Sequence, residues 1–94
     1  MFNNFSYNNY SYNNAKYIIE AAEKGVELLS KNIDYSTLNI WRKYILSIIN
    51  LVSKNTNKDI ISIYMQFNLS IMMFSPYEQV KRTVEFLINI AKVV

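Results

Sequence analysis

The seven carboxylates are the side chains on which an enzyme built from this sequence would depend, because its 94 residues include neither Cys nor His. Without those two residue types the chain cannot form a zinc site of the usual kind, an iron–sulfur cluster, a thiol nucleophile or a Ser-His-Asp triad. The presence of only one Gly also excludes glycine-rich phosphate loops, since each such motif needs at least two.

The carboxylates alternate with basic residues at helical spacing. Glu20, Glu23 and Glu27 alternate with Lys16, Lys24 and Lys31, and Glu78 and Glu85 with Lys81, Arg82 and Lys92. The spacing predicts three ion pairs in the first helix: Lys16 with Glu20, Glu20 with Lys24, and Glu27 with Lys31. Stripes of this kind are typical of a solvated helix surface. We therefore expect no enzyme activity, no bound metal and no cofactor.

The basic residues are concentrated in the second part of the chain. Residues 35–94 carry seven Lys or Arg and three acids, whereas residues 1–34 carry three Lys and four acids. The stretch between Asp34 and Asp59 holds Arg42, Lys43, Lys54 and Lys58. Lys43 and Lys54 are eleven residues apart and share a helical face, which could meet nucleic-acid phosphates. Nucleic-acid binding is therefore an alternative function, although no helix rich in base-reading residues accompanies this face.

Apolar residues recur with a period of 3.6 and predict four helices, at about 15–31, 35–53, 58–74 and 75–92. Short turns between helices of this length give an all-α, small antiparallel four-helix bundle. The longest uncharged stretch, 60–77, contains too many polar residues to predict a membrane span. Residues 1–5 lack the features of a secretory signal, so we expect a cytoplasmic protein.

Residues 1–14 form a low-complexity arm of Asn, Tyr, Phe and Ser that precedes the helical domain at 15–94. Two five-residue repeats, FSYNN and YSYNN, follow each other directly, and the arm carries no charge. Such a composition predicts a disordered N-terminal arm.

Several residues predict the positions of helix ends and of a close helix contact. Asn32 tolerates a left-handed end of the first helix, and Asp34 or Ser36 can cap the second. Residues 56–59 indicate a cap with an acidic third position, and residues 75–78 indicate a capping box with Pro at its first helical position.

Gly25 lies at the centre of the apolar face of the first helix. Because Gly costs about 1 kcal/mol relative to Ala inside a helix, we expect another helix to approach closely at this point.

The predicted helices carry more apolar surface than a small bundle can bury. The helix at 58–74 is apolar on almost every side, and its only polar strip is Ser62, Gln66 and Ser70. Such a helix is either central and buried or in contact with a partner. Six residues fall outside the inward stripes or extend a stripe that is already full, and we expect them near a protein contact: Ile40, Tyr44, Leu51, Met65, Met73 and Phe74. In the last helix we expect Val80, Val84, Leu87, Ile88 and Ala91 to face inward.

The layout of residues 14–94, with Ser75-Pro76-Tyr77-Glu78-Gln79 opening the last helix, resembles the small bacteriocin immunity proteins of Gram-positive bacteria. The resemblance is one of architecture, and it implies a cytoplasmic four-helix bundle that binds a protein. Members of that family commonly end in a polar tail that contributes to specificity, whereas this chain has Ala91-Lys92-Val93-Val94 there. The segment Gly25-Val26-Glu27-Leu28-Leu29, followed by Trp41, also resembles helical adaptor segments of bacterial defence proteins.

These observations predict a non-enzymatic protein that acts by protein–protein binding, as an immunity, inhibitor or adaptor factor. We also expect self-association, as a dimer or a higher oligomer, because of the apolar circumference of the third predicted helix. The rival is nucleic-acid binding through Arg42, Lys43, Lys54 and Lys58.

Overall fold

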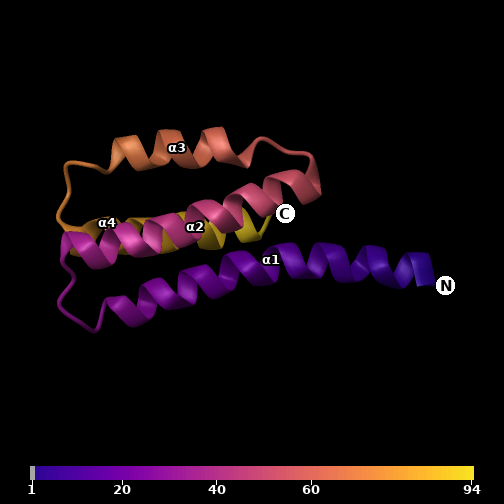
Figure 1. Ribbon diagram of the computed structural model, residues 1–94, viewed down its shortest axis with the longest axis horizontal. Helices are drawn as coiled ribbons and strands as arrows, with labels where there is room; N and C mark the ends of the chain where they lie inside the picture. The colour runs from indigo at the N-terminus through magenta and orange to yellow at the C-terminus, as the bar shows by residue number, and fades with distance from the viewer. Residues whose placement is uncertain (1) are drawn as a thin grey trace.

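Across residues 2–94, the computed structural model is all-α, with four helices: α1 (Phe2–Leu28), α2 (Tyr35–Thr56), α3 (Ile60–Ser70) and α4 (Pro76–Ala91). The structure describes the backbone of residues 2–94 and the side chains of residues 13–94. Consecutive helices run antiparallel (Figure 1), so the predicted all-α four-helix bundle is confirmed. The arm predicted at 1–14 falls, apart from Asn13 and Asn14, on residues whose side chains are not described, and its disorder stays a prediction. Asn14 itself is buried in α1 and accepts a hydrogen bond from Asn55 Nδ2 at 3.0 Å.

The helices form three layers, with α2 and α4 in the middle, α1 on one side and α3 on the other (Figure 1). Helix α1 packs against α4 and α2, and the backbone of α3 packs against α2 alone. Aromatic rings extend the contact from α3 to α4: the Phe67 and Phe86 rings stack with centroids 4.3 Å apart, and Tyr64 lies 6.1 Å from Phe86. Helix α3 is therefore an outer helix rather than a central one.

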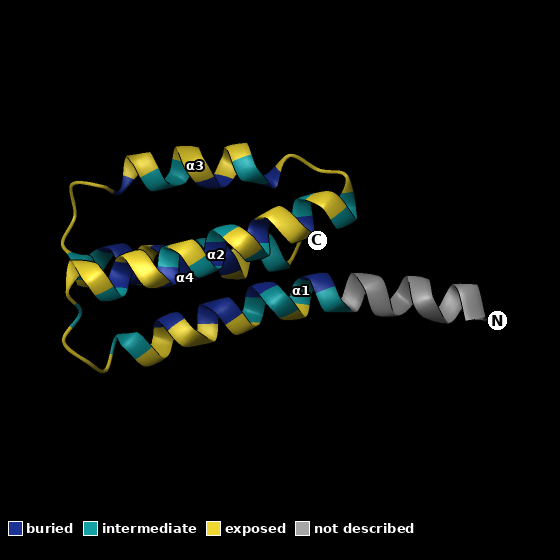
Figure 2. Ribbon diagram, in the orientation of Figure 1, coloured by how far each residue is buried: buried dark blue, intermediate teal, exposed yellow. Residues whose placement is uncertain are grey.

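The core lies where α1, α2 and α4 meet and is extended by Ile60 and Tyr64 of α3, and the buried residues lie along the sides that face it (Figure 2). Its buried members are Ile18, Ala21, Ala22, Leu38, Trp41, Ile45, Ile49, Val52, Ile60, Tyr64, Val80, Val84 and Leu87. Ile88, which was expected to face inward, is 40% exposed, and Gln79 and Thr83 are buried in α4. Compared with the predicted inward face, the buried face of α4 is therefore rotated toward Gln79 and Thr83 and away from Ile88.

Gly25 is a point of close approach between α1 and its neighbours, as the sequence predicted. A Cβ on Gly25 would lie 2.5 Å from Trp41 Cζ2 and 2.6 Å from Val84 Cγ2. Trp41 is fixed in this position because its Nε1 donates a hydrogen bond to the Ala21 carbonyl at 3.0 Å. The absence of a side chain at Gly25 thus allows α2 and α4 to pack onto α1.

Each of α2, α3 and α4 begins at a side chain that accepts a hydrogen bond from a backbone N–H three residues later. Asp34 accepts from Thr37 (2.8 Å), Asp59 from Ser62 (3.1 Å) and Ser75 from Glu78 (3.3 Å). The caps predicted at Asp34 and Ser75 are confirmed. The cap expected within 56–59 is wrong in register, because Thr56 still belongs to α2 and Asp59 itself is the cap.

Several helix ends differ from the prediction: α1 spans Phe2–Leu28 rather than 15–31, α2 continues to Thr56 rather than 53, and α3 begins at Ile60 rather than 58. The left-handed residue is Asn57 (φ 55°), not Asn32, and the Asn57 N–H donates to the Ser53 carbonyl. Helix α3 ends at Ser70, four residues before the predicted end, and residues 71–75 form the turn to α4.

Candidate interaction surfaces

The turn between α3 and α4 is held by one buried side chain from the next helix. Gln79 is 3% exposed, and its Nε2 donates hydrogen bonds to the carbonyls of Met72 (3.3 Å) and Phe74 (2.9 Å). These bonds satisfy two carbonyls of the turn. A continued helix could not have paired the Met72 carbonyl, because residue 76 is Pro and has no N–H. The backbone is therefore fixed on both sides of Met73.

Phe74 and Arg82 hold the same turn from its outer side. The Arg82 guanidinium lies 4.0 Å from the centroid of the Phe74 ring, a cation–π contact, and its Nε donates to Glu78 Oε2 at 3.1 Å. Phe74 is thus packed against α4, which leaves Met73 as the projecting side chain of the turn.

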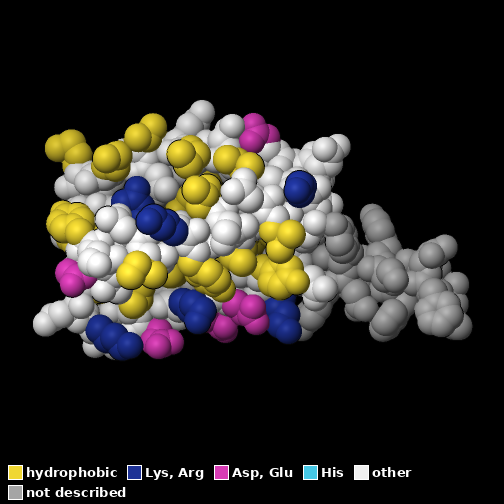
Figure 3. Space-filling model, viewed as in Figure 1, with side chains coloured by type: hydrophobic (Ala, Val, Ile, Leu, Met, Phe, Trp, Pro, Cys, Tyr) yellow, Lys and Arg dark blue, Asp and Glu magenta, His cyan; other side chains and the backbone are white. Residues whose placement is uncertain are grey.

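Met73 is 97% exposed, and three further exposed apolar side chains precede it, two on α3 and one in the turn. Met65, Leu69 and Met72 follow one another at spacings of four and three residues, and each is about half or more exposed. Together with Met73 we call them the α3 stripe. Hydrophobic side chains gather along the α3 edge of the molecule in Figure 3. Residues 60–77 themselves carry no charge, and Arg42 and Lys43 of α2 border the stripe at Met65.

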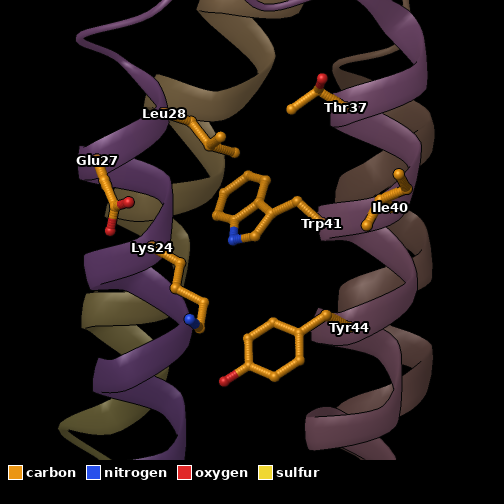
Figure 4. A pocket seen from close by; sticks show the side chains of 7 residues that line it. All are labelled: Lys24, Glu27, Leu28, Thr37, Ile40, Trp41 and Tyr44. Carbon is orange, nitrogen blue, oxygen red and sulfur yellow. The ribbon is translucent and has the colours of Figure 1, made fainter.

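A second apolar surface is the groove between α1 and α2, with a volume of about 300 Å³ (Figure 4). Its lining residues are Lys24, Glu27, Leu28, Thr37, Ile40, Trp41 and Tyr44. The Trp41 indole fills the space between the helices, and Lys24 points toward Tyr44, with its Nζ 5.9 Å from the ring centroid. This groove is shallow because the Trp41 side chain, which covers the core at this point, forms its floor.

The groove between α2 and α3 is basic and has a volume of about 330 Å³. Its lining residues are Asn39, Arg42, Lys43, Leu46, Tyr64, Met65 and Asn68. The Tyr64 hydroxyl and Asn68 Oδ1 are both buried in the wall of this groove. Burial raises the pKa of the Tyr64 hydroxyl, and a side-chain hydrogen bond with Asn68, the charge of Arg42 and a hydrogen bond with Arg42 oppose this rise by smaller amounts.

A third groove lies where α2 turns into α3, and it contains the other two predicted basic residues. Its lining includes Leu51, Lys54, Lys58 and Asp59. Lys58 is partly engaged within the protein, because its Nζ donates to the Val93 carbonyl at 2.9 Å. The four basic residues of the nucleic-acid hypothesis therefore fall into two pairs, with Asp59 beside the second pair.

The six predicted contact residues are likewise distributed over several surfaces. Ile40 and Tyr44 line the α1–α2 groove, Leu51 lies at the α2–α3 turn, Met65 belongs to both the basic groove and the α3 stripe, and Met73 and Phe74 lie in the α3–α4 turn. The prediction did not include Leu69 or Met72, which the structure exposes on the same stripe. Their spacing from Met65 was the signal that could have identified them.

The carboxylates of α1 are exposed: Glu20, Glu23 and Glu27 line an open surface groove together with Lys24 and Tyr44. Of the three expected ion pairs, the structure forms the one between Glu27 and Lys31, with the charged atoms 3.8 Å apart. The pairs that Glu20 was expected to form with Lys16 and Lys24 are not formed, and Lys24 contacts the Tyr44 ring instead. Among the residues that the structure describes, no group of three carboxylates is placed to hold a metal ion. Within the same part of the chain, no helix has both the length and the hydropathy needed to cross a membrane.

Comparison of the chain with protein-family models, curated proteins and solved structures finds no match. No family is therefore identified for the chain, and the function has to be argued from the surfaces themselves.

Proposed function

We propose that this protein acts in the cytoplasm by binding another protein through the α3 stripe, as an immunity, inhibitor or adaptor factor, and that it catalyses no reaction. The observation that supports the proposal is Met73, 97% exposed on a turn that Gln79 holds from within the fold. A large apolar side chain in that position has no role in the packing of the monomer.

The energetics favour Met73 as the anchor of the contact. Full burial of a Met side chain contributes about 1.5–3 kcal/mol, and binding energy at interfaces is concentrated in a few such residues. Because Gln79 already fixes the turn, little backbone ordering is needed when a partner binds. The flexible side chains of Met65 and Met72 can then adapt to the surface around the anchor.

The chemistry of the stripe defines the partner surface. Residues 60–77 contain no charged side chain, so the matching surface is an apolar groove or the apolar face of a helix. Association through such surfaces changes little with salt, in contrast to binding through phosphates.

The test compares Met73→Asp with Val26→Asp in affinity capture from a lysate of the source cells at high salt. Val26 is a matched control because it is a 55% exposed apolar residue on a different helix, α1. We expect a protein that the wild type and Val26→Asp retain and that Met73→Asp loses. If Met73→Asp and Val26→Asp capture the protein equally, Met73 is not part of the contact.

Nucleic-acid binding is the rival function, and the positions of Arg42 and Lys43 in one groove support it as a second candidate. Both line one groove that contains no carboxylate, and neither forms an ion pair with a described acid. Each phosphate contact would lower log K by about 0.9 per log unit of salt. Tight, salt-sensitive binding of duplex DNA or RNA that Lys43→Glu combined with Lys54→Glu abolishes would establish this rival.

A further inference from the structure

The α1–α2 groove continues along α1 into a second groove, which has a volume of about 400 Å³. The two grooves share three lining residues, Lys24, Glu27 and Tyr44. The second groove adds Glu20 and Glu23 of α1. The joint surface, which we call the extended groove, therefore follows α1 from Glu20 to Leu28. This stretch is about 12 Å long, or about two helical turns.

The apolar part of the extended groove is left uncovered by the fold. Ile40 on the α2 side is 68% exposed, and Leu28 on the α1 side is only partly buried. Trp41 forms the floor at this point, and the hydrogen bond from its indole to the Ala21 carbonyl holds it in place. Figure 3 shows hydrophobic side chains beside the charged side chains of α1. Because the floor is already fixed, little ordering is needed when an apolar side chain binds on it.

The charge of the lining is negative, in contrast to the net charge of +3 of the whole chain. Three carboxylates, Glu20, Glu23 and Glu27, line the extended groove together with a single amine, that of Lys24. Glu20 and Glu23 form no ion pair with a described residue. The pair between Glu27 and Lys31 has its charged atoms 3.8 Å apart and is exposed at both ends, so it contributes little. The carboxylates are therefore free to pair with the cations of a partner.

We propose that the extended groove binds an amphipathic helix that carries Lys or Arg beside its apolar face. One apolar side chain of this helix lies on Trp41, between Ile40 and Leu28, and its basic side chains pair with Glu20 and Glu23. A helix in a groove places its anchors at spacings of three, four and seven residues, and seven residues of helix match the length of the extended groove. The α3 stripe lies on the opposite outer helix (Figure 1), so this site is separate from the stripe.

Trp41 makes binding at this site observable, because it is the only Trp of the chain and lies on the floor of the groove. The probe is a synthetic helix of Leu and Lys, about 14 residues long with Leu on one face, titrated at low salt into the full chain. We expect one peptide bound per chain, with a change in Trp41 emission excited at a wavelength that Tyr does not absorb. The same peptide with Glu in place of each Lys should bind at least about tenfold more weakly.

Two matched pairs of variants locate the contact. Glu23→Lys and Glu85→Lys change the net charge equally at exposed positions of α1 and α4, and we expect only Glu23→Lys to weaken peptide binding, by about tenfold. Ile40→Gln and Leu69→Gln remove apolar side chains that are 68% and 69% exposed, and we expect only Ile40→Gln to weaken binding, also by about tenfold. Leu69 belongs to the α3 stripe, so this control also separates the site from the proposed function.

The proposal is overturned if the Leu–Lys peptide at about 1 mM leaves the Trp41 emission unchanged. It is also overturned if Glu23→Lys and Glu85→Lys weaken binding equally, because the attraction then comes from net charge alone, or if the Glu peptide binds as tightly as the Lys peptide. Weaker binding in Leu69→Gln but not in Ile40→Gln would place the peptide on the α3 stripe instead. A Trp41 emission that changes with protein concentration, before any peptide is added, would assign the groove to a second copy of the chain and would likewise overturn the proposal.

Discussion

Gly25 lies where side chains of α2 and α4 pack closely onto α1, and its substitution tests the core directly. Gly25→Ala would gain about 1 kcal/mol of helix propensity, but its Cβ would overlap Trp41 and Val84. Overpacking of a buried site costs about 1–3 kcal/mol, and the short contacts place this position toward the upper end of that range. We therefore expect a net loss of about 1–2 kcal/mol in the free energy of unfolding, measured with urea.

The matched background for that measurement is Trp41→Phe, which removes the two ring atoms nearest to the new Cβ. Trp41→Phe is itself destabilising because it deletes the hydrogen bond to Ala21, but Gly25→Ala should cost less in this background than in the wild type. If Gly25→Ala instead stabilises the protein by its full helix propensity, the close contact is wrong.

The capping aspartates predict a particular dependence of stability on pH. The backbone N–H of Thr37 lowers the pKa of Asp34 below 3.8, and the Ser62 side chain, followed by its backbone, does the same for Asp59. A carboxyl whose pKa is depressed in the folded state stabilises the fold above its unfolded pKa, and this contribution is lost as the pH falls through the folded value. Wild-type stability should therefore fall as the pH drops below 3.8.

Asp34→Ser keeps a capping side chain but removes the titration. We expect its unfolding free energy to fall less than that of the wild type between about pH 5 and about pH 2, as followed by urea unfolding. An equal fall in the two proteins would contradict the assignment of the Asp34 cap.

At the scale of the element, the α3–α4 turn depends on Gln79. Gln79→Ala deletes both hydrogen bonds and leaves the Met72 and Phe74 carbonyls without these donors. We expect a loss of about 1–3 kcal/mol in the free energy of unfolding, together with weaker partner binding because the turn is no longer fixed. Gln66→Ala, at an exposed position on α3, is the control and should stay within about 0.5 kcal/mol of the wild type. Equal stability of the two variants would show that Gln79 does not hold the turn.

Features of these helices could be predicted from the sequence where they depend on residues close together in the chain, and could not be predicted where they depend on contacts between helices. The caps at Asp34 and Ser75 and the close approach at Gly25 could be predicted, because each depends on residue type and helical period. The rotation of α4 could not, because Gln79 and Thr83 are polar and a hydrophobic pattern does not count them as core. Both side chains form hydrogen bonds within the protein. Gln79 donates to the turn carbonyls, and Thr83 donates to the Gln79 carbonyl at 2.7 Å. These bonds offset the free-energy cost of burying the two polar side chains.

The candidate sites were less predictable than the helices for a related reason. Helical spacing placed Lys43 and Lys54 on one face, but it could not show that Arg42 and Lys43 share a groove with Tyr64 and Asn68 of another helix. Such a grouping depends on how α3 packs against α2, which is a tertiary contact. The exposure of Met73 similarly depends on the Gln79 bonds, which cross the turn.

At the scale of the whole molecule, the two outer helices present opposite kinds of surface. Helix α1 has exposed Lys and Glu on its outer side, whereas α3 has uncharged apolar residues there. In the absence of its partner, we expect the α3 stripe to cover itself by two-fold pairing of two copies, since an isologous contact needs only one patch. Light scattering should then give a dimer whose population rises with concentration, and Leu69→Asp should give a monomer. A wild-type species of 11.1 kDa at all concentrations would contradict self-association.

The most direct test of protein binding through the α3 stripe is hydroxyl-radical footprinting of Met73, read by mass spectrometry. Tyr35, 60% exposed and outside the stripe, provides the internal reference. Purified protein at low concentration should oxidise rapidly at Met73. On addition of a lysate of the source cells, we predict that Met73 oxidation falls sharply relative to the labelling of Tyr35, because a partner covers the stripe. An unchanged ratio of Met73 to Tyr35 labelling in the lysate would contradict the proposed function.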